Sequence, residues 1–173
     1  KIKHASFEPE IIFGEINNSQ SERIHSVKEI FDRSGIQNSI PEDIQLEIWK
    51  KFLFIVTISG IGGLTRVPIG RIRESEYLVD LMQKTALEIL DVANAKKIPL
   101  TREHVKEVFE IIAIQPFETT ASTQRDLMNE RPSELEKFNG FIVQEGARLG
   151  IPTPVNKFIY ECLLPMEQKA RNL

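Results

Sequence analysis

The sequence predicts a mainly α-helical protein in which a helical bundle domain follows a small α/β unit. From residue 41 onward, apolar residues recur at the three- and four-residue spacing of helices that bury one face. Before residue 41, a short apolar run, a helical stripe and a second apolar run follow one another, which is the order of one α/β unit. The 173 residues suffice for one domain and part of another, and we place the boundary between residues 40 and 41.

The α/β unit begins with an apolar run, residues 11–16, that ends at the turn signal Asn17-Asn18 and predicts a strand. Residues 2–7 are a candidate partner for it, and residues 36–40 predict one more short strand. A unit of this size cannot form a stable sheet alone. We therefore expect residues 1–40 to be the end of a larger α/β domain.

A helix is predicted between these strands. Ser19 and Glu22 have the spacing of a capping box, and apolar residues then follow at helical spacing. Gly35 is placed where a glycine commonly ends a helix.

Capping signals divide residues 41–173 into about six helices. The first is predicted to start at a capping box formed by Ser39 and Glu42, and Gly60-Ile61-Gly62-Gly63 is expected to weaken or end it. Further starts are predicted at Ser75, at Thr101, near Ala121, at a third capping box formed by Ser133 and Glu136, and at Thr153-Pro154. The helix that follows Ser133 is expected to end at Gly150.

Composition excludes several classes of function. The net charge of −3 gives no basic field for nucleic acid or an anionic membrane. The single cysteine, Cys162, rules out a disulfide within the chain, which fits a reducing cytoplasm, and its apolar neighbours predict a buried thiol. The apolar stretch 52–64 falls short of the ~20 residues that a membrane helix needs, and residues 1–7 have no apolar core of a signal peptide.

Residues alone do not predict a catalytic centre. The three histidines lack the spacing of metal ligands, so no metal is expected. The glycine run 60–63 follows a helical pattern instead of a strand, which is the wrong context for a dinucleotide phosphate loop.

Several segments, taken in order and spacing, resemble the ketopantoate reductase (2-dehydropantoate 2-reductase) family. They are Ile48-Trp49-Lys50-Lys51-Phe52, Ser122-Thr123-Gln124-Arg125-Asp126, Arg131 to Glu136 with Asn139-Gly140, and Gly150 to Asn156. Upstream, Ile11 to Glu15 and Ser21 to Arg23 resemble the end of the family's nucleotide-binding domain. The resemblance implies a helical bundle like the C-terminal domain of 6-phosphogluconate dehydrogenase at residues 41–173, used for substrate binding and dimerisation. It implies the remnant of an NADP-binding Rossmann domain at residues 1–40.

The resemblance also implies a reaction and its residues. The family reduces 2-dehydropantoate to pantoate with NADPH, in pantothenate and coenzyme A biosynthesis. Lys51 matches the catalytic lysine, and Glu134 the glutamate that contacts the hydroxyl and keto groups of the substrate. Ser122 matches the serine that binds the substrate carboxylate, and Asp126 is a candidate supporting group one turn later.

Each of these residues also has a simpler interpretation. Lys51 could pair with Glu47 on an exposed helix face, and from spacing alone that pair is favoured. Glu134 could be an ordinary acid in a first helical turn, and Ser122 a helix cap or an exposed hydroxyl. The resemblance to the family makes us prefer the catalytic role over these simpler interpretations.

The sequence departs from the family pattern at Ile55 and Ser59, where many members carry asparagine. These positions leave open a reductase for another 2-keto acid, and a catalytically silent helical dimerisation module is a further alternative. The family's glycine-rich cofactor loop lies near the N-terminus of the parent chain and is absent here. We therefore expect this chain alone neither to bind NADPH tightly nor to turn over, and we expect the parent enzyme to be cytoplasmic and homodimeric.

Overall fold

The computed structural model describes residues 9–172. The chain divides into two compact units between Ile48 and Trp49. The earlier expectation of a strand in residues 2–7 lies outside the described residues.

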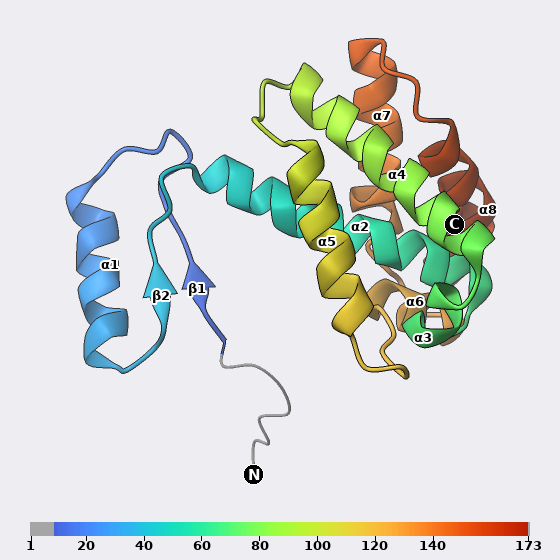
Figure 1. Ribbon diagram of the computed structural model, residues 1–173, viewed down its shortest axis with the longest axis horizontal. Helices are drawn as coiled ribbons and strands as arrows, with labels where there is room; N and C mark the ends of the chain where they lie inside the picture. The colour runs from blue at the N-terminus through green and yellow to red at the C-terminus, as the bar shows by residue number, and fades with distance from the viewer. Residues whose placement is uncertain (1–8, 173) are drawn as a thin grey trace. The chain divides into compact units, whose positions relative to one another are not determined.

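The first unit has the predicted strand, helix, strand order (Figure 1). Strand β1 spans Ile11–Ile12, helix α1 spans Glu22–Arg33, and strand β2 spans Asn38–Ser39. The two strands pair in parallel, with Ile11 opposite Asn38. A parallel pair joined through a helix is the basic α/β connection.

The N-cap of helix α1 lies two residues later than predicted. Ser21, not Ser19, is the N-cap, and its hydroxyl accepts a hydrogen bond from the backbone N–H of Ile24. The Ser21 hydroxyl also donates to Glu15 at 2.6 Å, which holds it over the end of the helix. The predicted capping box at Ser19 and Glu22 is therefore wrong, whereas the predicted stop is confirmed because Gly35 has a φ of +68°.

Helices build the second unit (Figure 1). The elements are α2 (Ile44–Thr65, whose first turn lies in the first unit), α3 (Ile69–Arg73), α4 (Glu76–Ala95), α5 (Arg102–Ile114), α6 (Ser122–Met128), the 3-10 helix η1 (Leu135–Lys137), α7 (Asn139–Leu149) and α8 (Pro154–Ala170). The predicted caps at Ser75 and Thr101 and the start at Pro154 are confirmed. The short helix α3 was not predicted.

The glycine run 60–63 does not end α2, contrary to the prediction. The helix continues to Thr65 because neighbouring side chains pack closely where the glycines lack a side chain. Gly60 faces Ile159 and Asn139, Gly62 faces Gln124, and Gly63 faces Leu127 and Leu163. Close packing by three other helices offsets the low helix propensity of glycine.

Two further predicted helix starts are wrong. At the start of α2, Asp43 is the cap: its Oδ1 accepts from the backbone N–H groups of Gln45 and Leu46, while Ser39 lies in β2. The α-helix predicted from Ser133 begins only at Asn139, as α7. The Ser133 hydroxyl donates to the distant Glu167 and accepts from the backbone N–H of Leu135 at 3.2 Å, but only the 3-10 helix η1 follows it. The predicted end of α7 at Gly150 is confirmed by a left-handed C-cap there.

The core of the second unit lies where α2, α4, α7 and α8 meet. Its fully buried side chains include Leu53 and Ile61 of α2, Ile89 of α4, Ile142 of α7, and Ile159 of α8. Helix α2 could cross a membrane by length and composition alone, but half of its apolar window is buried in the structure, so the signal is weak.

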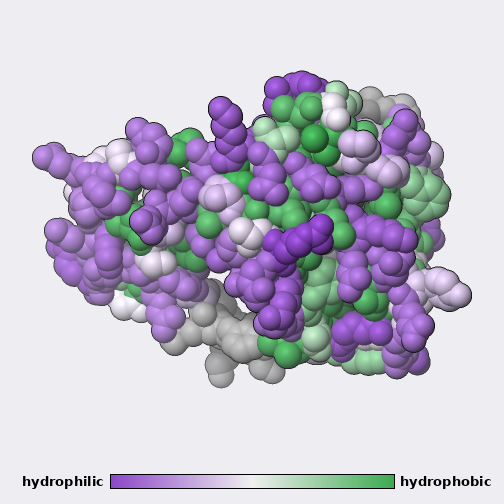
Figure 2. Space-filling view, turned by 45° about the horizontal axis from the view of Figure 1, so that its top comes forward, coloured by the Kyte–Doolittle hydropathy of each residue, from purple (hydrophilic) through white to green (hydrophobic). Residues whose placement is uncertain are grey.

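The surface is mainly hydrophilic on the face shown in Figure 2, with apolar residues exposed in small areas. Cys162 belongs to the exposed residues of α8. The predicted buried thiol is therefore wrong, because the cysteine falls outside the apolar stripe on which Ile159 and Leu163 lie.

Candidate active site

Lys51 lies in the second turn of α2 and its side chain is exposed. Its Nζ lies 5.9 Å from the centre of the Phe54 ring. It forms no hydrogen bond or ion pair with any of residues 9–172, so the simple pair with Glu47 is not formed there. The ammonium group is therefore available to a ligand.

Aromatic packing fixes the backbone around Lys51. Phe52 stands edge-on to Trp49 at 5.4 Å and to Phe141 of α7 at 5.6 Å, measured between ring centres. Leu53 is fully buried on the next position. A flexible charged side chain thus extends from a rigid turn.

The helix face that carries Lys51 becomes progressively buried along α2. Ile55, one turn later, is half-buried, and Ser59, two turns later, is buried. These are the two positions where the sequence departs from the family pattern. The apolar side chain of Ile55 therefore lies where this face of α2 is still partly accessible to solvent.

Ser122 is the first residue of α6, and its exposed hydroxyl has no hydrogen bond to the described residues. The cap position belongs to Ala121 instead. The helix is anchored next to it by Gln124, whose amide donates to the carbonyl of Val67 at 3.0 Å and contacts Gly62 of α2. Gly62 lies 11 residues after Lys51 on α2, which corresponds to ~16 Å along a helix axis.

Asp126 is half-buried and pairs with Arg131, with 2.9 Å between Oδ1 and Nη2. The backbone N–H of Arg131 also donates to the backbone carbonyl of Asp126 at 2.9 Å. Asp126 thus ties α6 to the segment that leads to Glu134.

Glu134 immediately precedes η1, and not the first turn of an α-helix as predicted. Its neighbours Ser133 and Leu135 are buried, whereas its own side chain is exposed. Among the described residues the Glu134 carboxylate has no hydrogen-bond or ion-pair partner. Within the described part of the chain it is thus an unpaired carboxylate on a firmly held backbone.

Aromatic rings connect helix α2, which carries Lys51, to the segment that carries Glu134. Phe52, next to Lys51, packs on Phe138 at 6.2 Å between ring centres. The backbone N–H of Phe138 in turn donates to the Glu134 carbonyl at 3.0 Å. Within residues 9–172, no hydrogen bond or ion pair joins any two of Lys51, Ser122, Asp126 and Glu134.

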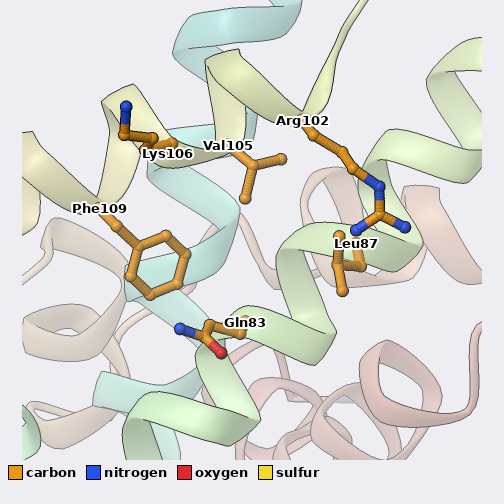
Figure 3. Close-up of a pocket in the computed structure, with 6 residues that line it drawn as sticks. All are labelled: Gln83, Leu87, Arg102, Val105, Lys106 and Phe109. Atoms are coloured by element: carbon orange, nitrogen blue, oxygen red, sulfur yellow. The ribbon is translucent and has the colours of Figure 1, made fainter.

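One cavity of about 300 Å³ lies away from these residues, between α4 and α5 (Figure 3). Its lining is Gln83, Leu87, Arg102, Val105, Lys106 and Phe109. None of the predicted site residues lines it, and no sequence pattern predicted it.

Neither a metal centre nor a phosphate loop occurs in the described part of the chain. No group of three metal-binding side chains lies together within residues 9–172. Gly60 to Gly63 lie inside α2 against packed side chains, so their backbone N–H groups are not arranged to hold a phosphate. The described residues thus do not fit the phosphates of a dinucleotide.

Comparison with known proteins shows the family. Residues 43–167 match the model described as ketopantoate reductase PanE/ApbA C terminal. The chain belongs to this family. The predicted family and the predicted mainly helical fold class are thereby confirmed.

Curated relatives of the family agree. The chain is 31% identical over 144 residues to the 2-dehydropantoate 2-reductase of Pyrobaculum aerophilum, covering 83% of the chain and 51% of that protein. It is 29% identical over 160 residues to the uncharacterized oxidoreductase YkpB of Bacillus subtilis, covering 92% of the chain and 53% of that protein. The chain thus spans about half the length of these relatives.

Solved structures share the fold. The PanE/ApbA family ketopantoate reductase of Ralstonia eutropha matches with a TM-score of 0.84 at 23% identity, over 95% of this chain and 53% of that one. A D-mandelate dehydrogenase with NADH and anilino(oxo)acetate matches with a TM-score of 0.82 at 19% identity, over 94% of this chain and 68% of that one.

Sequence reasoning missed the buried charged residues that hold the helices around the site. Glu167 and Glu88 are buried, and each binds backbone N–H groups of a distant segment. A signal for Glu167 was present, because it falls on the apolar stripe of α8 after Ile159 and Leu163 at four-residue spacing.

Proposed function

We propose that the complete protein carrying this chain is an NADPH-dependent 2-dehydropantoate 2-reductase that forms pantoate for pantothenate and coenzyme A biosynthesis. In this proposal residues 41–173 are its substrate-binding and dimerisation domain, and residues 1–40 are the end of its NADP-binding Rossmann domain. One observation carries the proposal. Three residues lie in segments that resemble the family pattern: Lys51, Ser122 and Glu134. Among the described residues their polar side-chain groups form no hydrogen bond or ion pair, while their backbones belong to packed segments.

The substrate is a carboxylate with a neighbouring ketone, and its reduction needs a proton and a cation at the ketone oxygen. A reduced nicotinamide cofactor supplies the hydride. Lys51 would donate the proton to the ketone oxygen and stabilise negative charge that develops on it. An ammonium group without an ion-pair partner among residues 9–172 suits this role, because no described residue shares its proton.

The other residues would bind and orient the substrate. The Ser122 hydroxyl would donate to the substrate carboxylate, and Glu134 would accept a hydrogen bond from the substrate hydroxyl. Asp126 would act indirectly, since it holds Arg131 and with it the segment before Glu134. A correct orientation of this kind lowers the entropic barrier of the reaction.

The cofactor would be bound by residues outside this chain. The connection between β1 and α1 has the single glycine Gly14, and no strand of the described residues is followed by the glycine-rich loop that dinucleotide phosphates require. The 173-residue chain alone should therefore show no tight NADPH binding and no turnover. A fluorescence titration of the isolated chain with NADPH that gave tight binding would contradict this part of the proposal.

A homodimer in the cytoplasm is the proposed assembly and location. A dimeric ketopantoate reductase from Staphylococcus aureus shares the fold, at 22% identity and a TM-score of 0.83. Sedimentation of the complete protein tests the assembly, and a monomer at micromolar concentration would contradict it.

Ile55 favours a second candidate, a reductase for a different and more apolar 2-keto acid. Its half-buried apolar side chain occupies a position where the family resemblance implies asparagine. The D-mandelate dehydrogenase whose structure holds anilino(oxo)acetate has the same fold. If the candidate is correct, Ile55→Asn will shift relative kcat/KM towards 2-dehydropantoate, and an unchanged ratio would oppose it.

The deciding experiment follows NADPH oxidation by the complete protein with 2-dehydropantoate and with a panel of aliphatic and aromatic 2-keto acids. Fast turnover of 2-dehydropantoate supports the proposed function. Turnover of another keto acid alone selects the second candidate. Folded protein without turnover of any of them contradicts both and favours a silent helical module.

A further inference from the structure

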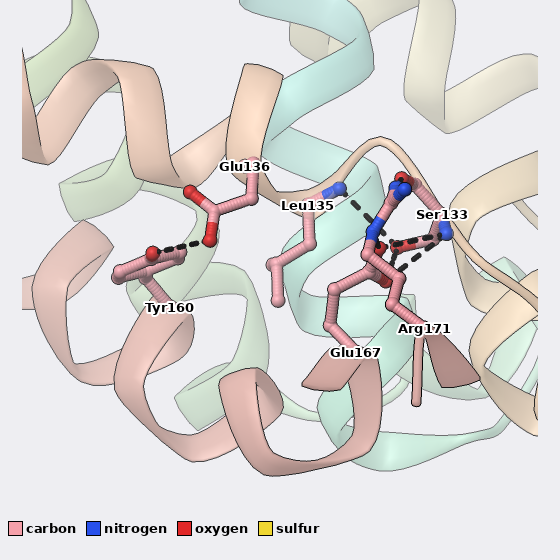
Figure 4. Close-up of polar contacts among 6 residues, drawn as sticks. All are labelled: Ser133, Leu135, Glu136, Tyr160, Glu167 and Arg171. Carbon is pink, nitrogen blue, oxygen red and sulfur yellow. Dashed lines mark hydrogen bonds and ion pairs between the residues drawn. The ribbon is translucent and has the colours of Figure 1, made fainter. Parts of the chain in front are cut away.

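A buried carboxylate of α8 holds the residue before Glu134. The side chain of Glu167 is 2% exposed. Its two oxygens accept from the backbone N–H of Ser133 at 3.1 and 3.0 Å, and Oε2 also accepts from the Ser133 hydroxyl at 2.5 Å (Figure 4). A buried charge is costly unless it is paired and hydrogen-bonded, so these contacts are strongly favoured over a displaced arrangement.

Arg171, one turn further along α8, completes the arrangement. Its Nε donates to Oε1 of Glu167 at 2.5 Å, and its Nη2 donates to the backbone carbonyl of Ser133 at 2.8 Å (Figure 4). The N–H, the hydroxyl and the carbonyl of Ser133 are thus all bound by one ion pair. This leaves Ser133 little freedom to move relative to α8.

A second anchor lies on the other side of Glu134. Tyr160 of α8 donates its hydroxyl to Oε1 of Glu136 at 2.8 Å (Figure 4). Burial first, and then the Glu136 carboxylate, raise the pKa of Tyr160 to about 12, so the phenol keeps its proton at neutral pH. Between the anchors, the Leu135 side chain is fully buried.

The result is a fixed backbone that carries one free acid. Ser133, Leu135 and Glu136 are all held, while the Glu134 carboxylate is exposed and unpartnered within the described residues. A ligand-binding group works best when its supporting contacts fix it to within about 0.5 Å.

We infer that Glu167 and Arg171 are positioning residues for Glu134 in substrate binding. The inference rests on the proposed function, because it requires that Glu134 contacts the substrate. The pair acts through the backbone of Ser133, which it holds on three sides, and not by contact with the substrate. Its loss lets the Glu134 carboxylate move away from the geometry that the substrate requires.

The test uses the complete protein and compares Glu167→Gln with a matched control, Glu130→Gln. Glu130 lies in the same linker between α6 and η1 and pairs with Lys169 of α8 at 2.6 Å, but both side chains are 68% exposed. Each variant is made in the wild type and in a Glu134→Gln background. The melting temperature of each variant is measured first. Then kcat and KM are measured with the keto acid that the wild type reduces, at a temperature well below the lowest melting temperature of the set.

We expect Glu167→Gln to lower kcat/KM on the order of 10-fold when Glu134 is intact, since small displacements in a site cost this much or more. In the Glu134→Gln background it should change kcat/KM less than about 2-fold, because no positioned carboxylate remains to be lost. Glu130→Gln should leave kcat/KM unchanged in both backgrounds. If Glu167 had a purely structural role, Glu167→Gln would lower kcat/KM by the same factor in both backgrounds, or only in proportion to the fraction of unfolded protein.

Equal losses in both backgrounds would overturn the inference while leaving the proposed function standing. Wild-type activity of Glu134→Gln itself, or no turnover of any keto acid, would contradict the proposed function, and the inference with it. Should Glu167→Gln fail to fold, Arg171→Lys decides by the same cycle. Arg171 is 42% exposed at its side chain, and lysine keeps the charge beside Glu167 but not the second donor to Ser133.

Discussion

The carboxylate of Glu88 on α4 binds Asn156 in the first turn of α8 through both backbone and side chain. Its Oε2 accepts from the backbone N–H at 2.9 Å and from the side-chain amide at 2.8 Å. Oε1 accepts from the backbone N–H of Val155 at 2.8 Å. A buried acid on one helix thus satisfies free N–H groups at the N-terminus of another.

Removing this acid should destabilise the second unit. We expect Glu88→Ala to lower the free energy of unfolding by about 3 kcal/mol, because buried N–H donors lose their partners. Urea denaturation of the complete protein measures the change. Asp80→Ala on the same helix is the control: Asp80 is 57% exposed and its one ion pair among the described residues is with Lys84, so a change below about 0.5 kcal/mol is expected. Equal effects of the two variants would contradict the assigned role of Glu88.

Gly60 and Gly63 of α2 should respond differently to alanine. A Cβ on Gly60 would lie 2.7 Å from Cγ2 of the buried Ile159, whereas a Cβ on Gly63 would lie 3.1 Å from the flexible ends of Leu127 and Leu163. Alanine gains about 1 kcal/mol in helix propensity at either site. We expect Gly60→Ala to be destabilising by about 1–2 kcal/mol net, and Gly63→Ala to change stability by less than about 1 kcal/mol. Thermal denaturation of both variants checks which loses more stability. A larger loss for Gly63→Ala than for Gly60→Ala would contradict the close packing of Ile159 on Gly60.

Glu145 of α7 gives the fold a pH dependence. Hydrogen bonds from Arg148, and then from Lys96 at the end of α4, lower the pKa of Glu145 from 4.5 to about 2. The ionised carboxylate therefore stabilises the folded state above about pH 4.5, and this contribution is lost as the pH falls through about 2.

The corresponding variant is Glu145→Gln. At pH 7 we expect it to lower the free energy of unfolding by about 1 kcal/mol, a modest value because the pair is partly exposed to solvent. The difference from wild type should narrow as the pH is lowered from about 4.5 towards 2. Unfolding by urea at several pH values measures it, and a difference independent of pH would speak against the assigned ion pairs.

Local signals predicted the parts of the fold that depend on neighbouring residues. Ser75 and Thr101 cap their helices as expected, because a cap needs only an N–H within the next turn. Ser133 has the same local pattern and accepts from the backbone N–H of Leu135, but only the 3-10 helix η1 follows it, and its hydroxyl donates to Glu167, 34 residues later. A contact of that sequence separation is not visible in a local pattern.

The glycine run in α2 illustrates the same limit. Glycine propensity predicts a break at residues 60–63, but Ile159 and Leu163 of α8 and Gln124 of α6, which are distant in the sequence, pack there. For the site, the resemblance supplied Lys51, Ser122, Asp126 and Glu134, and the structure adds that three of these have free polar ends among the described residues.

The most direct test is the kinetics of Lys51→Ala in the complete protein, with Lys157→Ala as the matched control. Lys157 is an exposed helical lysine on α8 whose Nζ lies 3.7 Å from Glu161, and no role in the site is predicted for it. We predict that Lys51→Ala keeps the fold and melting temperature but lowers kcat for the keto acid by at least roughly 100-fold, the usual loss when a proton donor is removed. Lys157→Ala should match the wild type. Wild-type kcat in folded Lys51→Ala would contradict the account.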